Sequence, residues 1–197
     1  GIALLVALAS CRHPRTQLVV RVDSDIPHGP GRALQGVRVT VQVPGEASPR
    51  LREQLLLGVT SDRNIVLPAD LVGISPRNND PSRVVTVTID ALGAGFPERE
   101  VLFSTSATTS FVRDESRVLP FFLANHCRVD FRMCPAGQTC GRSGCEPIAR
   151  EAAELPAFEP DAGPPLADAR GDRTDLDALS LDGDSDAAGS DAPAFDA

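Results

Sequence analysis

Alternation of apolar and polar residues is the main pattern in the first two thirds of this 197-residue chain. It is clearest in two segments, Val37-Arg38-Val39-Thr40-Val41-Gln42-Val43 and Val85-Thr86-Val87-Thr88-Ile89. A period of two places the apolar side chains on one face of a strand and the polar ones on the other. Both segments therefore predict half-buried strands of an antiparallel sheet.

Further strands are expected at residues 18–22, 99–104 and 118–123, which are short and rich in Val, Leu and Phe. The pattern is weaker at residues 55–59 and 65–67. There, a short helix over residues 50–57 is an alternative that the sequence leaves open.

Turn residues separate these strands. Pro, Gly, Asn and Asp cluster at residues 27–31, 44–46, 76–81 and 93–97. Short strands with such turns, and no long amphipathic helix between them, predict an all-β fold over residues 16–125. The expected architecture is an antiparallel β-sandwich, immunoglobulin-like or transthyretin-like. Its core must come from Val, Leu, Ile and Phe, because the chain has no Trp and no Tyr.

Charge divides the chain into two regions. Residues 1–150 carry 17 Arg and 14 acidic residues, whereas residues 151–197 carry two Arg and 13 acidic residues. All 19 basic residues are Arg, but the net charge of −8 argues against a nucleic-acid partner. Residues 148–197, rich in Pro, Ala, Gly and Asp, are expected to form a disordered acidic tail.

Within the tail, Asp182, Asp184 and Asp186 begin like a calcium-binding loop. Ala187 stands where such a loop has glycine, and Pro193 stands where it has a bidentate glutamate. A solvated spacer with diffuse cation binding is therefore favoured over a dedicated calcium site.

An apolar run over residues 2–9 is followed by Ser10 and Cys11. The run is far below the roughly 20 residues of a membrane-spanning helix and matches the h-region of a secretory signal. Leu8-Ala9-Ser10-Cys11 resembles the lipobox of bacterial lipoproteins, whose cysteine is diacylated, exposed by cleavage and then N-acylated. The alternative is a buried strand with an unmodified cysteine.

The resemblance implies a signal segment at residues 1–10, a lipidated Cys11 and an anchor over residues 11–15. It also implies a cell-envelope, extracytoplasmic location. Arg12 is not the aspartate associated with inner-membrane retention in this class, which favours the outer membrane. The chain is thus similar to envelope lipoproteins with a cysteine-rich segment.

Residues 126–147 form that cysteine-rich knuckle, with Cys127, Cys134, Cys140 and Cys145 at spacings C-x6-C, C-x5-C and C-x4-C. With Cys11 lipidated, four thiols remain, and an oxidising compartment favours two disulfides. The segment resembles EGF-like cysteine knuckles but is too short for a full module. Of the three possible connectivities, we favour Cys127 with Cys140 and Cys134 with Cys145.

A zinc site is the alternative for these cysteines, with four thiolates or with three thiolates and His126. Structural zinc sites usually contain C-x2-4-C pairs, and only Cys140 and Cys145 have that spacing. Zinc would be favoured only if the protein were cytosolic.

Candidate catalytic residues are few. Ser24, Asp25 and His28 have the residue types of a nucleophilic triad, but three groups within one turn rarely reach triad geometry, so a polar turn is favoured. Asp23 and Asp25 could instead ligate a cation, although no third ligand is identifiable. The sequence contains no nucleotide-binding, zinc-protease or hydrolase motif.

These observations predict a lipid-anchored envelope protein that acts as a non-catalytic interaction or structural module, without a cofactor. Its expected partners are the membrane, through the lipid anchor, and an envelope protein that contacts strand edges or loops of the sandwich. The alternative function is metal binding, by zinc at the four knuckle cysteines or by calcium at the acidic tail.

Overall fold

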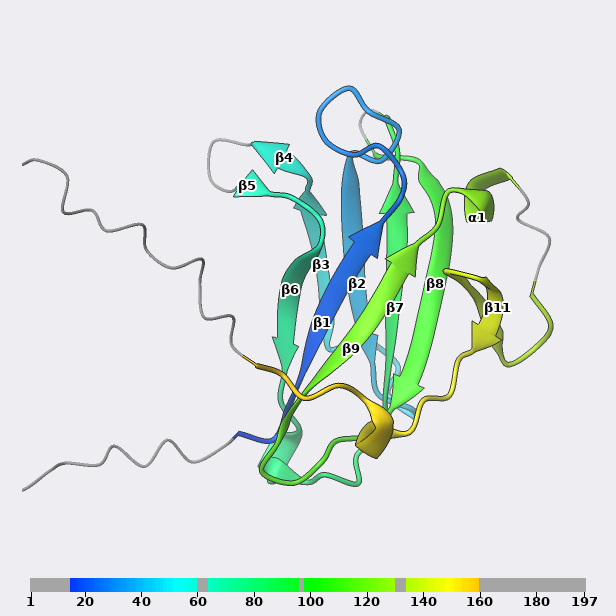
Figure 1. Ribbon diagram of the computed structural model, residues 1–197. Coiled ribbons are helices and arrows are strands. Elements are labelled where there is room, and N and C mark those ends of the chain that lie inside the picture. Colours follow the sequence, from blue (N-terminus) through cyan, green and yellow to red (C-terminus); the bar gives the residue numbers. More distant parts are fainter. Residues whose placement is uncertain (1–14, 60–63, 96–97, 130–133, 160–197) are drawn as a thin grey trace, which may run out of the picture. The chain divides into compact units, whose positions relative to one another are not determined.

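Two main sheets of the protein share one core, and two further strand pairs, β4-β5 and β10-β11, accompany them (Figure 1). A computed structural model of the chain describes residues 15–59, 64–95, 98–129 and 134–159. The expected signal segment, Cys11 and residues 160–197 of the expected tail lie outside the described residues.

The first sheet has four antiparallel strands in the order β3-β2-β7-β8, namely β3 (Leu51–Leu56), β2 (Gly36–Gln42), β7 (Val85–Leu92) and β8 (Val101–Thr109). The two strands predicted from alternation are its central pair, with Val39 opposite Ile89. Their apolar positions are buried and their polar positions are not, so the expected period of two is confirmed.

The second sheet has three strands in the order β6-β1-β9, namely β6 (Ala69–Ile74), β1 (Gln17–Ser24) and β9 (Ser116–Leu123). β1 is antiparallel to β6 but parallel to β9. The expectation of antiparallel strands therefore fails for this one pair. A parallel pair needs a long connection, and here the rest of the sandwich lies between β1 and β9 in sequence.

Several strands differ from the expected boundaries. Residues 51–56 form edge strand β3 rather than a helix, because they pair along their length with β2. β6 was not expected, and β8 continues to Thr109. Short strands β4 (Gly58–Val59) and β5 (Asn64–Ile65) link β3 to β6, and the 3-10 turn η1 (Arg77–Asn79) lies in the predicted turn at 76–81.

The core lies between the sheets and is aliphatic, as composition required. Phe103, Phe111 and Phe121 supply its aromatic part. No helix among the described residues is long and apolar enough to cross a membrane. The buried face of each sheet thus packs against the other sheet in a β-sandwich.

Residues 148–159 close one side of this sandwich. The Thr108 N–H donates to Ile148 O at 2.7 Å, and the Arg150 N–H donates to Thr108 O at 2.9 Å, so this segment first follows edge strand β8. After the 3-10 turn η2 (Ala152–Glu154), Phe158 N–H donates to Ser116 O at 2.8 Å on edge strand β9. The segment was expected to belong to the tail, which started at residue 148, but it joins the free edges of both sheets.

Candidate functional site

The cysteine-rich knuckle consists of helix α1 (His126–Val129) and the hairpin of β10 (Gln138–Gly141) and β11 (Gly144–Pro147). Disulfides join Cys127 to Cys140 and Cys134 to Cys145, with Cα–Cα distances of 6.0 and 5.6 Å. This is the pairing favoured from the sequence. The first bond ties the end of the sandwich to β10, and the second ties the intervening loop to β11.

Buried hydroxyl groups attach the knuckle to the sandwich. Thr139 Oγ1 donates to Thr105 Oγ1 at 3.1 Å and accepts the Ser106 N–H at 3.0 Å. Thr105 and Thr139 are only 3% and 7% exposed, and Cys127 is fully buried. The knuckle is therefore packed against β8 as part of the same body.

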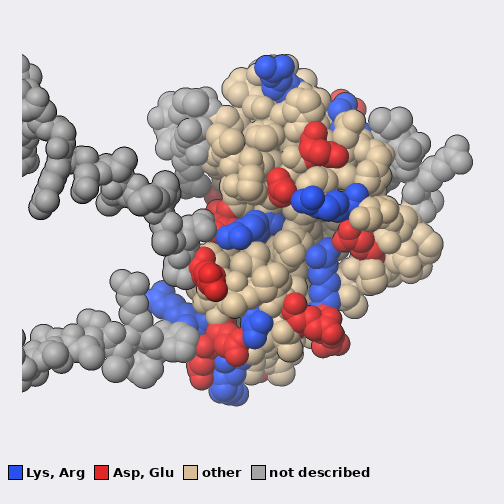
Figure 2. Space-filling model, in the orientation of Figure 1, with Lys and Arg blue, Asp and Glu red and all other residues tan. Residues whose placement is uncertain are grey.

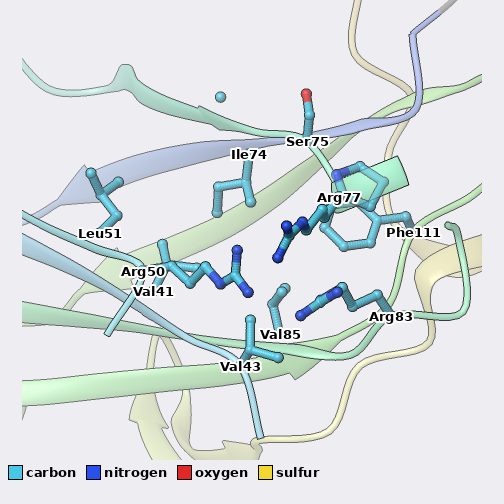
Figure 3. Close-up of a pocket in the computed structure, with 12 residues that line it drawn as sticks. Val41, Val43, Arg50, Leu51, Ile74, Ser75, Arg77, Arg83, Val85 and Phe111 are labelled. Carbon is cyan, nitrogen blue, oxygen red and sulfur yellow. The ribbon is translucent and has the colours of Figure 1, made fainter. Parts of the chain in front are cut away.

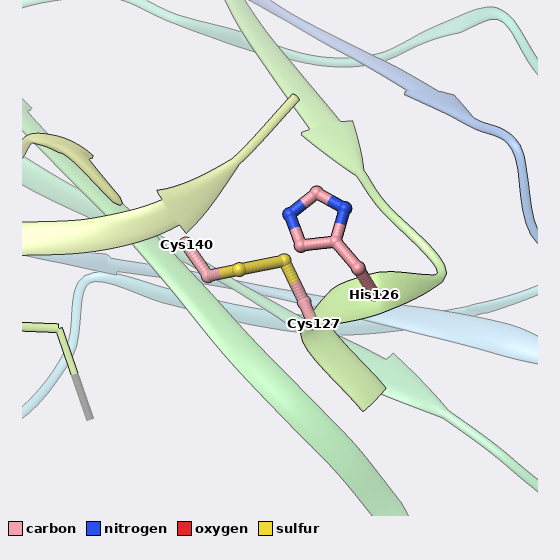
Figure 4. Close-up of side chains that lie close together, drawn as sticks. All are labelled: His126, Cys127 and Cys140. Carbon is pink, nitrogen blue, oxygen red and sulfur yellow. A yellow bond between two sulfur atoms is a disulfide. The ribbon is translucent and has the colours of Figure 1, made fainter. Parts of the chain in front are cut away.

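His126, Cys127 and Cys140 lie close enough together to suggest a metal site, with ligand atoms within 4.8 Å of one another (Figure 4). The two sulfur atoms, however, are bonded to each other. Zinc binds cysteine as the thiolate, which a disulfide does not provide. The expected alternative of four zinc-bound cysteines would therefore require reduction of both disulfide bonds. Of the three clustered residues, only His126 is exposed at the surface.

The candidate triad residues are not assembled. Ser24 Oγ donates to Leu123 O at 2.8 Å, and the Asp25 carboxylate accepts the Asn125 N–H at 2.6 Å. His28 Nδ1 lies 3.3 Å from Ile26 O, and its Nε2 lies 3.3 Å from the Leu67 N–H. A neutral His28 protonated at Nδ1 satisfies both contacts. Ser24 and Asp25 thus hold the chain at the end of β9, and His28 contacts its own turn and Leu67, as the polar-turn interpretation predicts.

Asp23 and Asp25 do not converge on a cation site either. Asp23 Oδ2 forms an ion pair with Arg142 Nη2 at 3.1 Å, while Asp25 is hydrogen-bonded to the backbone of the segment after β9. The two carboxylates therefore serve separate contacts, one to the knuckle and one to the end of the sandwich.

A shallow groove of about 310 Å3 runs between the outer face of β9 and the knuckle. The Arg142 guanidinium carbon lies 3.8 Å from the centre of the Phe122 ring, a cation–π arrangement. The charged residues that line the groove form ion pairs: Arg142 with Asp23, Arg150 with Glu146, and Arg21 with Asp70, which lies outside the lining. Figure 2 shows acidic and basic side chains interleaved on this face. Because these charges are paired, the groove has no excess charge of either sign to attract a charged ligand.

Among the groove residues, only Asp23 is a candidate site residue from the sequence. Arg142 lies between two glycines of the knuckle and carries no spacing that would mark it, because its partners come from β1 and β9. No protein-family model, no curated protein and no solved structure matches this chain.

Proposed function

We propose that the protein is an extracytoplasmic module of a bacterial cell envelope, tethered by a lipidated Cys11 and acting without catalysis on or beside another envelope protein. The observation that carries the proposal is the pair of disulfides built into the side of the sandwich. Stable disulfides are characteristic of oxidising, extracytoplasmic compartments. The sequence Leu8-Ala9-Ser10-Cys11 supports the membrane tether.

Lipidation provides a sufficient physical anchor. Each buried CH2 group contributes about 0.8 kcal/mol, and stable attachment takes more than one acyl chain. A lipobox cysteine receives three chains, so no membrane-spanning segment is needed. We assign the tether to the outer membrane because Arg12 follows the modified cysteine.

The two sides of the sandwich differ in a way that suggests where a partner binds. The edges of β8 and β9 are occupied by residues 148–158. Within the described residues, β3 and β6 are the opposite edges of the two sheets. An extended segment of another protein could pair with such an edge.

Edge β3 is also protected against uncontrolled pairing. Its exposed positions include Arg52 and Gln54, polar side chains of the kind that limit aggregation between sheet edges. We therefore place a selective protein contact, rather than self-association, at this edge.

Metal binding is the alternative function. Zinc at Cys127, Cys134, Cys140 and Cys145 would require all four to be free thiols, whereas the tethered module requires two disulfides. One measurement of thiol state therefore separates the two proposals.

The test is the intact mass of the full chain isolated from the membrane fraction of a bacterial host, alkylated with and without prior reduction. The tethered module predicts loss of residues 1–10, three acyl chains on Cys11, and four cysteines that alkylate only after reduction. A Cys11→Ser variant is the matched control and should leave the membrane fraction. An unacylated Cys11 would refute the tether, and thiols that alkylate without reduction would favour the zinc protein.

A further inference from the structure

A cavity of about 300 Å3 lies at the end of the sandwich where β2 and β6 finish and β3 and β7 begin. Its floor is apolar and belongs to the core between the sheets. The apolar lining side chains labelled in Figure 3 are Val41, Val43, Leu51, Ile74, Val85 and Phe111. Such a lining favours the apolar part of a ligand over water.

Three arginines stand around this apolar floor. Arg50 immediately precedes β3, Arg77 lies in η1, and Arg83 precedes β7. Figure 3 shows their guanidinium groups turned toward the same space. Two connections, β2–β3 and β6–β7, therefore supply three cationic groups to one cavity, and no acidic residue is among its lining residues.

The positive charge of the cavity is only partly neutralised. Glu46, which lies outside the lining, accepts hydrogen bonds from Arg50 Nε at 2.6 Å and from Arg83 Nη2 at 2.9 Å. The Asp80 carboxylate, which accepts the Ser82 hydroxyl at 2.7 Å and the Ser82 N–H at 3.0 Å, also interacts electrostatically with Arg83. Within the described part of the chain, Arg77 forms no ion pair. The cavity thus has positively charged side chains at its opening and apolar side chains at its base.

We propose that this cavity binds an amphipathic organic anion, with a carboxylate or phosphate head held by Arg50, Arg77 and Arg83 and a short apolar tail against Val43 and Phe111. Guanidinium groups pair with carboxylate and phosphate oxygens through charge-assisted hydrogen bonds. At roughly 30 Å3 per water-sized group, the volume admits a ligand on the order of ten non-hydrogen atoms. The cavity includes Leu51 of β3 and Ile74 of β6, but its test measures binding of a small anion rather than membrane attachment or a protein contact. Either proposal can therefore fail while the other stands.

Octanoate has the matching size and chemistry, and its binding tests the proposal. The protein is the full chain carrying Cys11→Ser, labelled with 15N, and amide shifts report binding because the chain has no Trp or Tyr for fluorescence. Octanoate should shift the amides of Val43, Ile74 and Phe111 saturably, with a Kd on the order of 0.1–1 mM. Butyrate, which keeps the head, and octanol, which keeps the tail, should each bind at least about tenfold more weakly.

Octyl phosphate in a parallel titration distinguishes the two head groups. Tighter binding than octanoate would assign a phosphate ligand, and weaker binding would assign a carboxylate ligand. Equal binding of octanoate and octanol would overturn the proposal, because the arginines would then contribute nothing. Shifts at other residues, or no saturation by 10 mM octanoate (on the order of ten times the expected Kd), would overturn it as well.

Variants isolate the arginines. Arg77→Gln should weaken octanoate binding about tenfold, the loss expected for one charge-assisted hydrogen bond. Arg32→Gln is the matched control, because Arg32 is exposed in the turn between β1 and β2, beyond the other end of β1. Glu46→Gln should strengthen binding, because it releases Arg50 and Arg83 from their carboxylate. Unchanged binding in Arg77→Gln with an intact amide spectrum would refute the assignment.

Discussion

The hydroxyl of Thr139, on the knuckle, lies 3.1 Å from the hydroxyl of Thr105, on β8, in a joint that is almost fully buried. The same Thr139 oxygen accepts the Ser106 N–H. One side chain therefore satisfies two polar groups of the sandwich at the place where the knuckle contacts it.

Thr139→Val should destabilise the fold by about 1–3 kcal/mol, because it keeps the shape of the side chain but leaves the Ser106 N–H buried without an acceptor. Urea denaturation followed by far-UV circular dichroism measures the change. Thr139→Ser is the control, since it retains the hydroxyl and should lose less. Equal losses in the two variants would mean that packing, not the hydrogen bond, holds the joint.

The two disulfides should be reduced in order. Cys127 is fully buried, whereas Cys145 is exposed, so a small thiolate reaches the Cys134–Cys145 bond first. A limited dose of reductant, followed by alkylation and peptide mass mapping, should label Cys134 and Cys145 before the other pair. Labelling of Cys127 ahead of Cys145 would contradict this order.

Removal of the buried disulfide should cost more stability than removal of the exposed one. The bonds span 13 and 11 positions, so the chain-entropy contribution is about 3 kcal/mol for each. Replacing Cys127 and Cys140 with Ala also removes buried sulfur from the core, whereas replacing Cys134 and Cys145 does not. Urea unfolding of both double variants tests the ranking, which equal losses would refute.

Asp90 should contribute more to the stability of the fold than Asp70. The Asp90 carboxylate accepts Arg38 Nε at 2.8 Å and Ser104 Oγ at 2.6 Å, and it is 14% exposed, against 28% for Asp70 in its pair with Arg21. Asp90→Asn should cost about 1–2 kcal/mol and Asp70→Asn under about 1 kcal/mol. The same urea measurements compare them, and the opposite ranking would show that burial does not set the strength of these pairs.

Lowering the pH should reduce the stability of the fold, in part because Glu46 becomes protonated. The Arg50 hydrogen bond, with help from Arg83, lowers the pKa of Glu46 below its ordinary value of 4.5. A carboxyl group with a lowered folded-state pKa stabilises the fold above its unfolded pKa, and this contribution is lost as pH falls through the folded value. Glu46→Gln should therefore flatten the stability curve below about pH 4.5. Urea midpoints between about pH 7 and pH 3 test this, and parallel curves for the two proteins would contradict it.

The sequence predicted the strands whose pattern is set by burial on one face. β2 and β7 alternate because they lie at the centre of a sheet with one face in the core. β6 was missed because Ala69–Ile74 is an edge strand with partly exposed side chains and no clear alternation. β3 could not be told from a helix until its pairing with β2 was known.

Contacts made by the backbone were harder to predict from the sequence than the strands. Residues 148–158 have the composition of a tail, yet they join β8 and β9 through main-chain hydrogen bonds that require no particular side chain. Likewise Arg50 lies in the β2–β3 connection and Arg77 and Arg83 lie in the β6–β7 connection, and only the fold brings them to one cavity. For the disulfides, the spacing left three connectivities open, and the structure contains the one that we favoured.

The parallel pairing of β1 with β9 also affects the order in which the strands can join during folding. Ser24 and Leu123, hydrogen-bonded at the ends of these strands, are 99 positions apart. β1 can therefore gain this neighbour only by closing a loop that contains the rest of the sandwich. Such distant pairing slows folding, since a large loop must close before the contact is gained. The second sheet therefore stays incomplete until β9 joins β1, and until then this edge of β1 is open to pairing with another extended chain.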